Sequence, residues 1–185
     1  MSEAVTPPAT RRVVAIAGSL RRGSWNRHLL RAVAELAPPA LSLTVYDGLA
    51  SIPMFDEDLE ATRRGGVDEL RTLIAHADGI LFATPEYNRS IPGVLKNALD
   101  WLSRSDVLSG KPVGVLGATP GPWGTRLAQA ELRRVLEATE AVVMPAPAVF
   151  LRDAAQLFDS DGHLTDLAVR DRVVAFCAAF ARWIR

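Results

Sequence analysis

The sequence predicts an α/β fold in which a parallel β-sheet lies between two layers of helices. Short apolar runs alternate along the chain with segments whose apolar residues recur every three or four positions. The runs are almost continuously hydrophobic, which is typical of parallel strands buried on both faces. With 185 residues, 49% of them hydrophobic, the chain can bury one sizeable core, which indicates a single domain.

Five apolar runs are expected to form the strands. They cover residues 13–17, 43–46, 79–83, 113–117 and 141–144. The segments between them have helical periodicity, so we expect crossover helices and a doubly wound, three-layer sandwich. The expected strand order of this five-stranded parallel sheet is 2-1-3-4-5.

The helices are marked by apolar residues at helical spacing. In the first two they are Leu29, Leu30, Val33 and Leu36, then Val67, Leu70, Leu73, Ile74 and Ala77. A last helix, entered through Thr165 and Asp166, would close one face of the sheet. Residues 1–11 are polar and contain two prolines, so we interpret them as a flexible tail before a single domain over residues 12–185.

The composition narrows the class of function. Acidic and basic residues balance at 21 each, so no overall field favours nucleic acid or an anionic membrane. The apolar runs are far shorter than the ~20 residues of a membrane span, and no signal peptide is recognisable, so we expect a cytoplasmic protein. Cys177 cannot form an intramolecular disulfide, and the three scattered histidines offer no metal-ligand spacing. A small-molecule task therefore fits best, without a metal.

The loop after the first predicted strand has features of a phosphate site. Gly18 and Gly23 allow the backbone to turn amide hydrogens inward, Ser19 and Ser24 add hydroxyls, and Arg21 adds charge. Ser24 is placed to cap the following helix. A Walker A loop is excluded because Ser24 and Trp25 stand where Lys and Ser or Thr are needed, and the dinucleotide fingerprint is missing. An ordinary capped turn with solvated arginines stays open at this point.

The loop after the third predicted strand, called the third loop below, lies in the expected topology beside the loop after the first strand, called the first loop. It covers residues 84–93, and its two prolines would stiffen it. Its backbone amides can face a ring that gathers negative charge when reduced. A rigid connection with a surface tyrosine is the alternative interpretation.

Together these segments resemble one known family. The motif Gly18-Ser19-Leu20-Arg21 with Ser24 and Asn26, and the motif Pro85-Glu86-Tyr87-Asn88 followed by residues 92–98 and 100–101, are similar to those of the NADPH-dependent FMN reductases. Within this family the chain most resembles the bacterial quinone and chromate reductases, which residues 52–59 also resemble. The resemblance covers the chain after the tail and implies a flavodoxin-like fold.

The resemblance also implies which residues bind the cofactor FMN. Those expected around the phosphate are Ser19, Arg21, Ser24, Trp25 and Asn26. Those expected along the ribityl chain and the isoalloxazine ring are Pro85, Glu86, Tyr87, Asn88 and Ser90. Thr119 and Gly121 are expected to complete the pocket from the loop after strand four, although Pro120, Pro122 and Trp123 depart there from the small residues of relatives.

The resemblance implies an NAD(P)H-dependent oxidoreductase, with NADPH or NADH as electron donor. Two-electron, ping-pong transfer to quinones, chromate, azo or nitro compounds or free flavin needs only an open flavin face, so we expect no dedicated catalytic acid or base. A flavodoxin-like electron carrier with protein partners is the main alternative. It is disfavoured because carriers usually display acidic docking surfaces and the charge here is balanced. Whether FMN stays bound or dissociates as a substrate is left open.

A homodimer or homotetramer is also expected. On the helix after the third loop, apolar residues span an arc of roughly 160°, wider than the ~100° stripe that covers a sheet. These residues are Val94, Leu95, Ala98, Leu99, Trp101 and Leu102. A partner subunit would cover part of this face, unless the last helix and residues 49–59 cover it within one subunit. The resemblance favours the oligomer.

Overall fold

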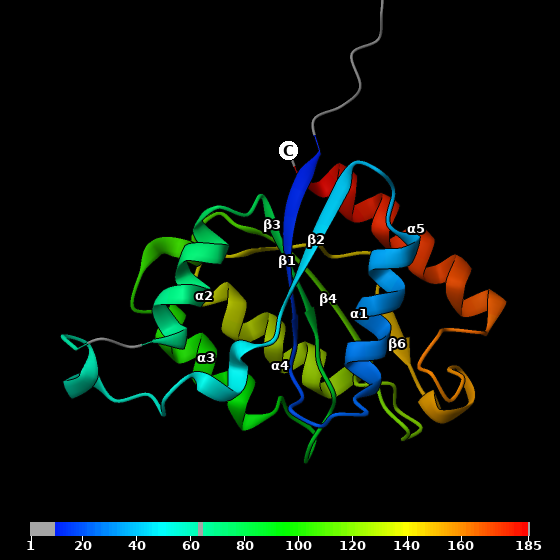
Figure 1. Ribbon diagram of the computed structural model, residues 1–185, viewed down its shortest axis with the longest axis horizontal. Coiled ribbons are helices and arrows are strands. Elements are labelled where there is room, and N and C mark those ends of the chain that lie inside the picture. Colours follow the sequence, from blue (N-terminus) through cyan, green and yellow to red (C-terminus); the bar gives the residue numbers. More distant parts are fainter. Residues whose placement is uncertain (1–9, 63–64, 185) are drawn as a thin grey trace, which may run out of the picture.

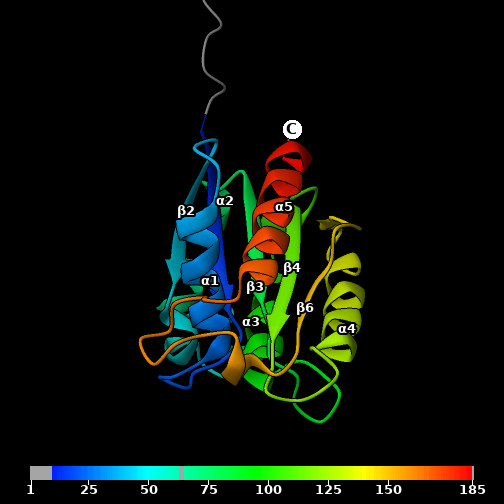
Figure 2. The same cartoon turned by 90° about the vertical axis from the view of Figure 1, so that its right-hand side faces the viewer.

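The computed structural model describes residues 10–62 and 65–184. A parallel sheet lies at its centre, with helices on both sides (Figures 1 and 2). The strands are β1 (Arg11–Ala17), β2 (Leu41–Tyr46), β3 (Gly79–Ala83), β4 (Pro112–Ala118), β5 (Val142–Val143) and β6 (Val149–Leu151). The α-helices are α1 (Trp25–Leu36), α2 (Gly66–Ala75), α3 (Gly93–Leu102), α4 (Arg126–Glu137) and α5 (Leu167–Trp183).

The sheet has the predicted order, β2-β1-β3-β4-β5, and every pairing between its strands is parallel. Strand β1 begins at Arg11, within the range assigned to the tail. Thr10 is exposed and precedes this strand, and residues 1–9 of that assignment lie outside the described residues.

The fifth position of the sheet differs from the expectation of one strand over residues 141–144. Two short strands share it: β5 pairs with the start of β4, and β6 pairs with the end of β4. Pro145 and Pro147 lie between them and have no N–H to donate to a ladder, so the pairing is interrupted. The run over residues 149–151 was missed because three residues are too short to be recognised by periodicity.

Strand alternation divides the interior into two cores. Val13, Ala15 and Ala17 of β1 face the core under α1 and α5, whereas Val14 and Ile16 face the core under α2, α3 and α4. Figure 2 looks onto the face covered by α1 and α5. The predicted last helix begins as expected, because the Asp166 side chain accepts a hydrogen bond from the Val169 amide at 2.8 Å.

The apolar face of α3 is covered within the subunit. Trp101 is fully buried and donates a hydrogen bond from its indole Nε1 to the carbonyl of Pro53 at 2.8 Å. Asn97 pairs with the same segment, through the Pro53 carbonyl and the Phe55 amide, and the Phe55 ring meets Trp101 edge to face. The wide arc of this helix is thus explained by residues 53–55, the intramolecular alternative, and it gives no support for a subunit interface.

Candidate functional site

Three loops meet at the carboxyl end of the sheet, at the lower end of the molecule in Figure 1. They follow β1, β3 and β4, and backbone hydrogen bonds extend the sheet into each of them. The Gly18 amide donates to the Ala83 carbonyl at 2.8 Å, and the Thr84 amide donates to the Leu116 carbonyl at 3.0 Å. The first and third loops are therefore neighbours, as the sequence predicted from the strand order.

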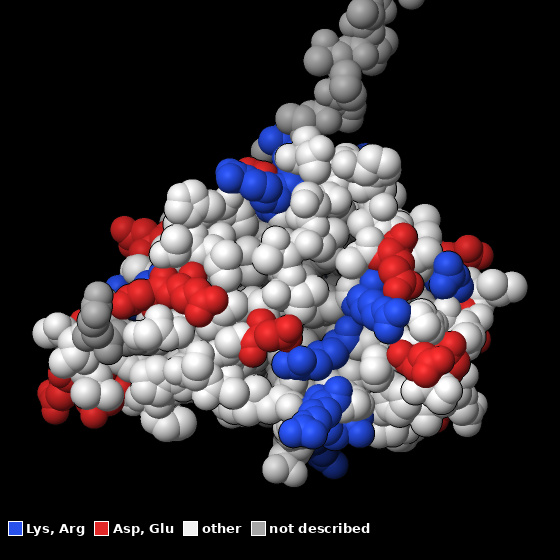
Figure 3. Space-filling model, in the orientation of Figure 1, with Lys and Arg blue, Asp and Glu red and all other residues white. Residues whose placement is uncertain are grey.

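The first loop brings positive charge and hydroxyl groups to this end. Figure 3 shows Lys and Arg side chains gathered over the lower end of α1 and the loop before it, the segment that carries Arg21, Arg22 and Arg27. The Arg21 guanidinium lies over the Trp25 ring, 5.8 Å from its centroid. Ser19 is buried, and its Oγ lies 3.4 Å from the Tyr87 hydroxyl, so two predicted site residues from different loops meet there.

Ser24 corrects one expectation and strengthens another. It occupies the N-cap position of α1, but its side chain forms no capping hydrogen bond within the described part of the chain. Its Oγ is buried and finds no hydrogen-bond partner among the described residues. Leaving a buried hydroxyl unpaired costs about 1–3 kcal/mol. A phosphate oxygen at the helix N-terminus would satisfy the hydroxyl and interact favourably with the helix dipole.

Asn26 has a structural task that the sequence did not reveal. Its Nδ2 donates to the Ala118 carbonyl at 2.9 Å, and its Oδ1 accepts from the Ala118 amide at 2.9 Å. The side chain is thus committed to joining the start of α1 to the end of β4. The backbone amide of Asn26, in the first turn of the helix, is also placed where a phosphate could accept from it.

The third loop closes on itself. The Tyr87 and Ser90 backbones exchange two hydrogen bonds of 3.0 Å, and both residues between them, Asn88 and Arg89, have positive φ angles of 52° and 64°. This is the geometry of a tight two-residue turn. Pro85 is buried, whereas the Tyr87 side chain is 51% exposed and flanks the space in front of Ser19.

The Glu86 carboxylate caps α4, which begins at Arg126. Its Oε2 accepts hydrogen bonds from the Leu127 amide at 2.9 Å and the Ala128 amide at 3.2 Å, in the first turn of α4. A carboxylate at a helix N-terminus is stabilised by the helix dipole. One carboxylate oxygen is therefore occupied as a cap for α4.

The loop after β4 is held by its backbone. The Thr119 amide donates to the Leu151 carbonyl at 2.9 Å, and the Thr119 carbonyl accepts from the Ala154 amide at 3.1 Å. The Thr119 Oγ1 accepts from the Gly121 amide at 3.2 Å, which brings these two predicted site residues together. Trp123, which marks the departure from relatives, is 71% exposed.

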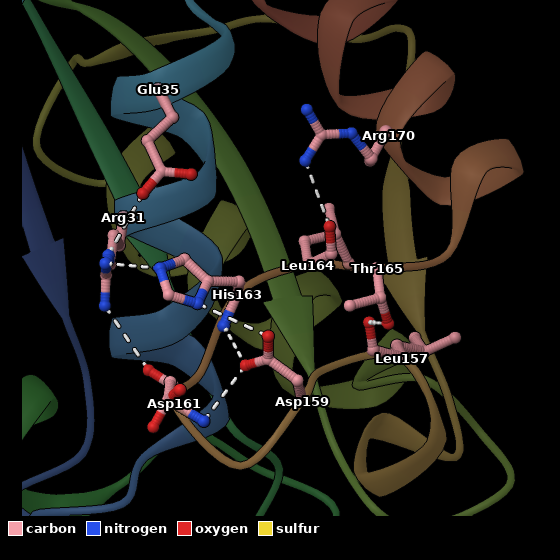
Figure 4. Close-up of polar contacts among 9 residues, drawn as sticks. All are labelled: Arg31, Glu35, Leu157, Asp159, Asp161, His163, Leu164, Thr165 and Arg170. Atoms are coloured by element: carbon pink, nitrogen blue, oxygen red, sulfur yellow. Dashed lines mark hydrogen bonds and ion pairs between the residues drawn. The ribbon is translucent and has the colours of Figure 1, made fainter.

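The segment before α5 supports the first loop. Phe158 stacks on Trp25 with ring centroids 5.8 Å apart, and His28 lies against both rings. Figure 4 shows the polar contacts that hold this segment to α1: the His163 ring lies between Asp159, at 3.3 Å, and Arg31, at 2.6 Å. Backbone N–H groups of His163 and Asp161 lower the pKa of Asp159. Sequence reasoning missed Phe158 as a support for Trp25, since no local motif marks it.

Other titratable groups lie apart from the three loops. The His76 Nδ1 contacts the Thr72 carbonyl at the end of α2, and burial lowers the pKa of His28. Burial raises the pKa of Cys177 to about 12, so its thiol stays protonated and unreactive. Among residues 10–62 and 65–184, no group of three His, Cys, Asp or Glu is placed to hold a metal, and no helix is long and apolar enough to cross a membrane.

The loops are chemically suited to FMN. A buried unpaired hydroxyl, an exposed arginine and a helix N-terminus match a phosphate, and the neighbouring loops offer backbone amides and Tyr87 to a planar ring.

Comparisons with known proteins agree with this chemistry. The family model of the NADPH-dependent FMN reductases matches residues 11–156. The chain is 40% identical to an NAD(P)H-dependent FMN reductase from Pseudomonas aeruginosa, over 94% of the chain and 95% of that protein. It is 37% identical to a 2-hydroxy-1,4-benzoquinone reductase from a Burkholderia species, over 94% of the chain and 96% of that protein.

A solved structure extends the likeness to three dimensions. The flavoenzyme NAD(P)H:acceptor oxidoreductase FerB from Paracoccus denitrificans superposes with a TM-score of 0.88 at 35% sequence identity. The match covers 95% of this chain and 97% of that one.

Proposed function

The chain belongs to the NADPH-dependent FMN reductase family, and we propose that its three loops at the carboxyl end of the sheet hold FMN. It is an NAD(P)H-dependent FMN and quinone reductase. In the proposed arrangement the first loop binds the phosphate and the third loop and the loop after β4 bind the ring. The observation that carries this proposal is the buried Ser24 hydroxyl, which lacks a partner among the described residues.

Each loop has its own part in the proposed mechanism. FMN, when bound, supplies two-electron hydride chemistry between a reduced nicotinamide and the acceptor. Ser19, Arg21, Ser24 and the first turn of α1 fix the phosphate, which anchors the cofactor. Backbone amides near Pro85 and Thr119 stabilise negative charge on the ring, because they are held in place by the sheet. Tyr87 stands at the edge of the open face, where donor and acceptor would bind in turn.

Steady-state kinetics test the function. NAD(P)H and a benzoquinone should be consumed one for one, and initial-rate plots at several quinone concentrations should give parallel lines, as alternating occupation of one face requires. Negligible NAD(P)H oxidation, with electron exchange only to protein partners, would instead identify an electron carrier. The visible spectrum of the dialysed protein tells whether FMN is retained as a prosthetic group or leaves as a substrate.

We also propose a wider acceptor range and a cytoplasmic location. The open face in this proposal would also admit chromate, azo and nitro compounds and free flavin, and rates with each of these measure the range directly. The cytoplasmic location also stays a prediction, tested by fractionation of the source cells.

We also propose that the chain forms a homodimer or homotetramer. Large apolar side chains remain exposed: Met54 is 77% exposed and Leu127 46%. The Leu127 amide is bound by Glu86, which places Leu127 beside the third loop. A partner covering these side chains would also border the acceptor space. Sedimentation at micromolar concentration tests the proposal, and a single species near 20 kDa with full reductase activity would overturn it.

A further inference from the structure

A second cavity lies beside the loop after β4, on the side of β6. Its volume is about 700 Å³, within the range of ~300–1,000 Å³ that small-molecule sites occupy. The wall consists of three parts: residues 122–124 and Arg126 after β4, residues 150–153 and 156–157 at and after the end of β6, and Val169 and Arg172 of α5. Of the twelve predicted cofactor residues, none lines it.

The cavity is positively charged in a chain that is neutral overall. Arg126, Arg152 and Arg172 line it, and Asp153 is its one acidic residue among those described, which leaves two positive charges in excess. The Arg152 Nε lies 3.7 Å from the Asp153 carboxylate, and the Arg152 side chain is 73% exposed, so this pair is weak. Arginines suit phosphate groups because the planar guanidinium can donate two hydrogen bonds to neighbouring oxygens.

The wall also offers a flat aromatic surface. The exposed Trp123 indole lines the cavity, and Arg126 is held against the Phe150 ring at 5.2 Å. Gly124 lets the two segments approach closely: it has a φ of +65°, and an added Cβ would lie 3.1 Å from the backbone of Phe150. A heterocyclic base could stack on Trp123 while the arginines bind its phosphate.

The cavity is connected to the proposed flavin site through Thr119. The Thr119 backbone bonds to Leu151, a wall residue, and to Ala154. The Thr119 Oγ1 accepts from the Gly121 amide, and both residues belong to the loop that, in the function proposed above, borders the ring. A ligand that reaches from the flavin face across this loop would enter the cavity. The reaction already supplies an elongated ligand with a base and phosphates at one end, the reduced nicotinamide dinucleotide.

We propose that this arginine-lined cavity binds the adenosine end of the electron donor and recognises the 2′-phosphate that distinguishes NADPH from NADH. The proposal rests on the function proposed above. It assigns Arg152 and Arg172 as residues that determine donor specificity, and Trp123 as the surface on which the adenine stacks. It also gives the departure at Pro120–Trp123 a task, because this loop then forms one wall of the donor site.

Binding of donor fragments to the FMN-free protein tests the site without turnover. In calorimetry, 2′,5′-ADP should bind more tightly than 5′-AMP. The variant R152Q/R172Q should lose about tenfold or more of the 2′,5′-ADP affinity, since it loses two charge-assisted contacts. The matched control is R182Q, which removes an exposed arginine from the last turn of the same helix, away from the cavity. Its affinity should equal that of the unmodified protein.

Kinetics provide the second readout. The ratio of KM for NADPH to KM for NADH should rise about tenfold in R152Q/R172Q and stay unchanged in R182Q. Equal affinity for 2′,5′-ADP and 5′-AMP, or an equal loss in R182Q, would overturn the proposal. Binding of inorganic phosphate as tight as that of 2′,5′-ADP would also overturn it, since the site would then be a general anion site.

Failure of the function and failure of the donor site can be told apart. If the unmodified protein bound no FMN and oxidised neither donor, the proposed function would be wrong. Calorimetry with 2′,5′-ADP and 5′-AMP would still test the donor site, because it requires no turnover. If FMN binding and quinone reduction were intact and the double variant showed no change in the donor ratio, only the donor site would fall.

Discussion

The loops after β1 and after β3 lie side by side but satisfy their polar groups differently. In the first, the Ser24 hydroxyl is buried and unpaired among the described residues, and Arg21 reaches over Trp25 at the surface. In the third, Tyr87 and Ser90 pair with each other, and the Glu86 carboxylate is bound by α4. The first loop thus leaves a buried hydroxyl without a partner among the described residues, whereas the third loop bonds within the protein.

This difference indicates how the two loops contribute to cofactor binding. Ligand affinity should depend on the first loop, where a phosphate would replace an unsatisfied group with a charge-assisted hydrogen bond. The third loop should act through its fixed shape, which presents backbone groups without reorganisation. Substitutions in the two loops should therefore separate into effects on FMN affinity and effects on stability.

Asn26 follows the first loop directly, yet its side chain forms its hydrogen bonds within the protein, as the groups of the third loop do. Asn26→Ala should lower the free energy of unfolding by about 2–4 kcal/mol, since the buried amide and carbonyl of Ala118 both lose their partner. Urea unfolding without FMN measures this. Asn88→Gly at the exposed tip of the third loop is the control, because glycine accepts its positive φ. A loss no larger than that of the control would contradict the structural role of Asn26.

Arg21→Ala tests the first loop as the phosphate site. FMN affinity should fall at least about tenfold, corresponding to roughly 1.5–3 kcal/mol for a charge-assisted contact, while riboflavin affinity should hardly change. Flavin fluorescence titration measures both. The control is Arg134→Ala on α4, which also removes a positive charge from a side chain that is 75% exposed. It should leave the affinity for both flavins unchanged. If riboflavin and FMN lost affinity equally, Arg21 would not be a phosphate ligand.

Ser24→Ala separates a ligand-binding hydroxyl from an ordinary helix cap. FMN affinity should fall about fivefold to tenfold, while the FMN-free protein should be as stable as before or up to about 1 kcal/mol more stable, because the hydroxyl has no bond to lose. An ordinary cap would instead cost about 0.5–2 kcal/mol of stability. Unfolding curves of the FMN-free protein show whether its stability is kept or lowered, and curves with FMN show the loss of FMN affinity.

Glu86→Gln should give the smallest effect and one confined to stability. The amide oxygen can still accept from α4, but the interaction of a full charge with the helix dipole is lost, which is worth about 0.3–1 kcal/mol. Thermal unfolding of the FMN-free protein detects the change. Glu131→Gln within the same helix is the control, since it lies away from the helix N-terminus. If Glu131→Gln lowered the stability by as much as Glu86→Gln, the capping role of Glu86 would be contradicted.

Sequence periodicity was sufficient where neighbouring residues determine the outcome. The alternation of continuous apolar runs with helical segments predicts the parallel sheet, and sequence spacing placed Asp166 before α5. It was insufficient for α3, whose wide apolar arc suggested a partner subunit. The cover comes from Pro53 and Phe55, more than 40 residues away, and no pattern within the helix specifies which segment will pack on it.

The sequence by itself determined the strand order, the three loops and the residue types suited to a phosphate, because these depend on local periodicity and on the rules of parallel sheets. Only the tertiary structure decided what each side chain does. Asn26 reaches Ala118 across 92 residues, Glu86 reaches α4 across 41, and Ser24 is left without either kind of bond among the described residues. Hydrogen bonds between distant segments depend on how the helices pack on the sheet, and no pattern within one segment specifies that packing.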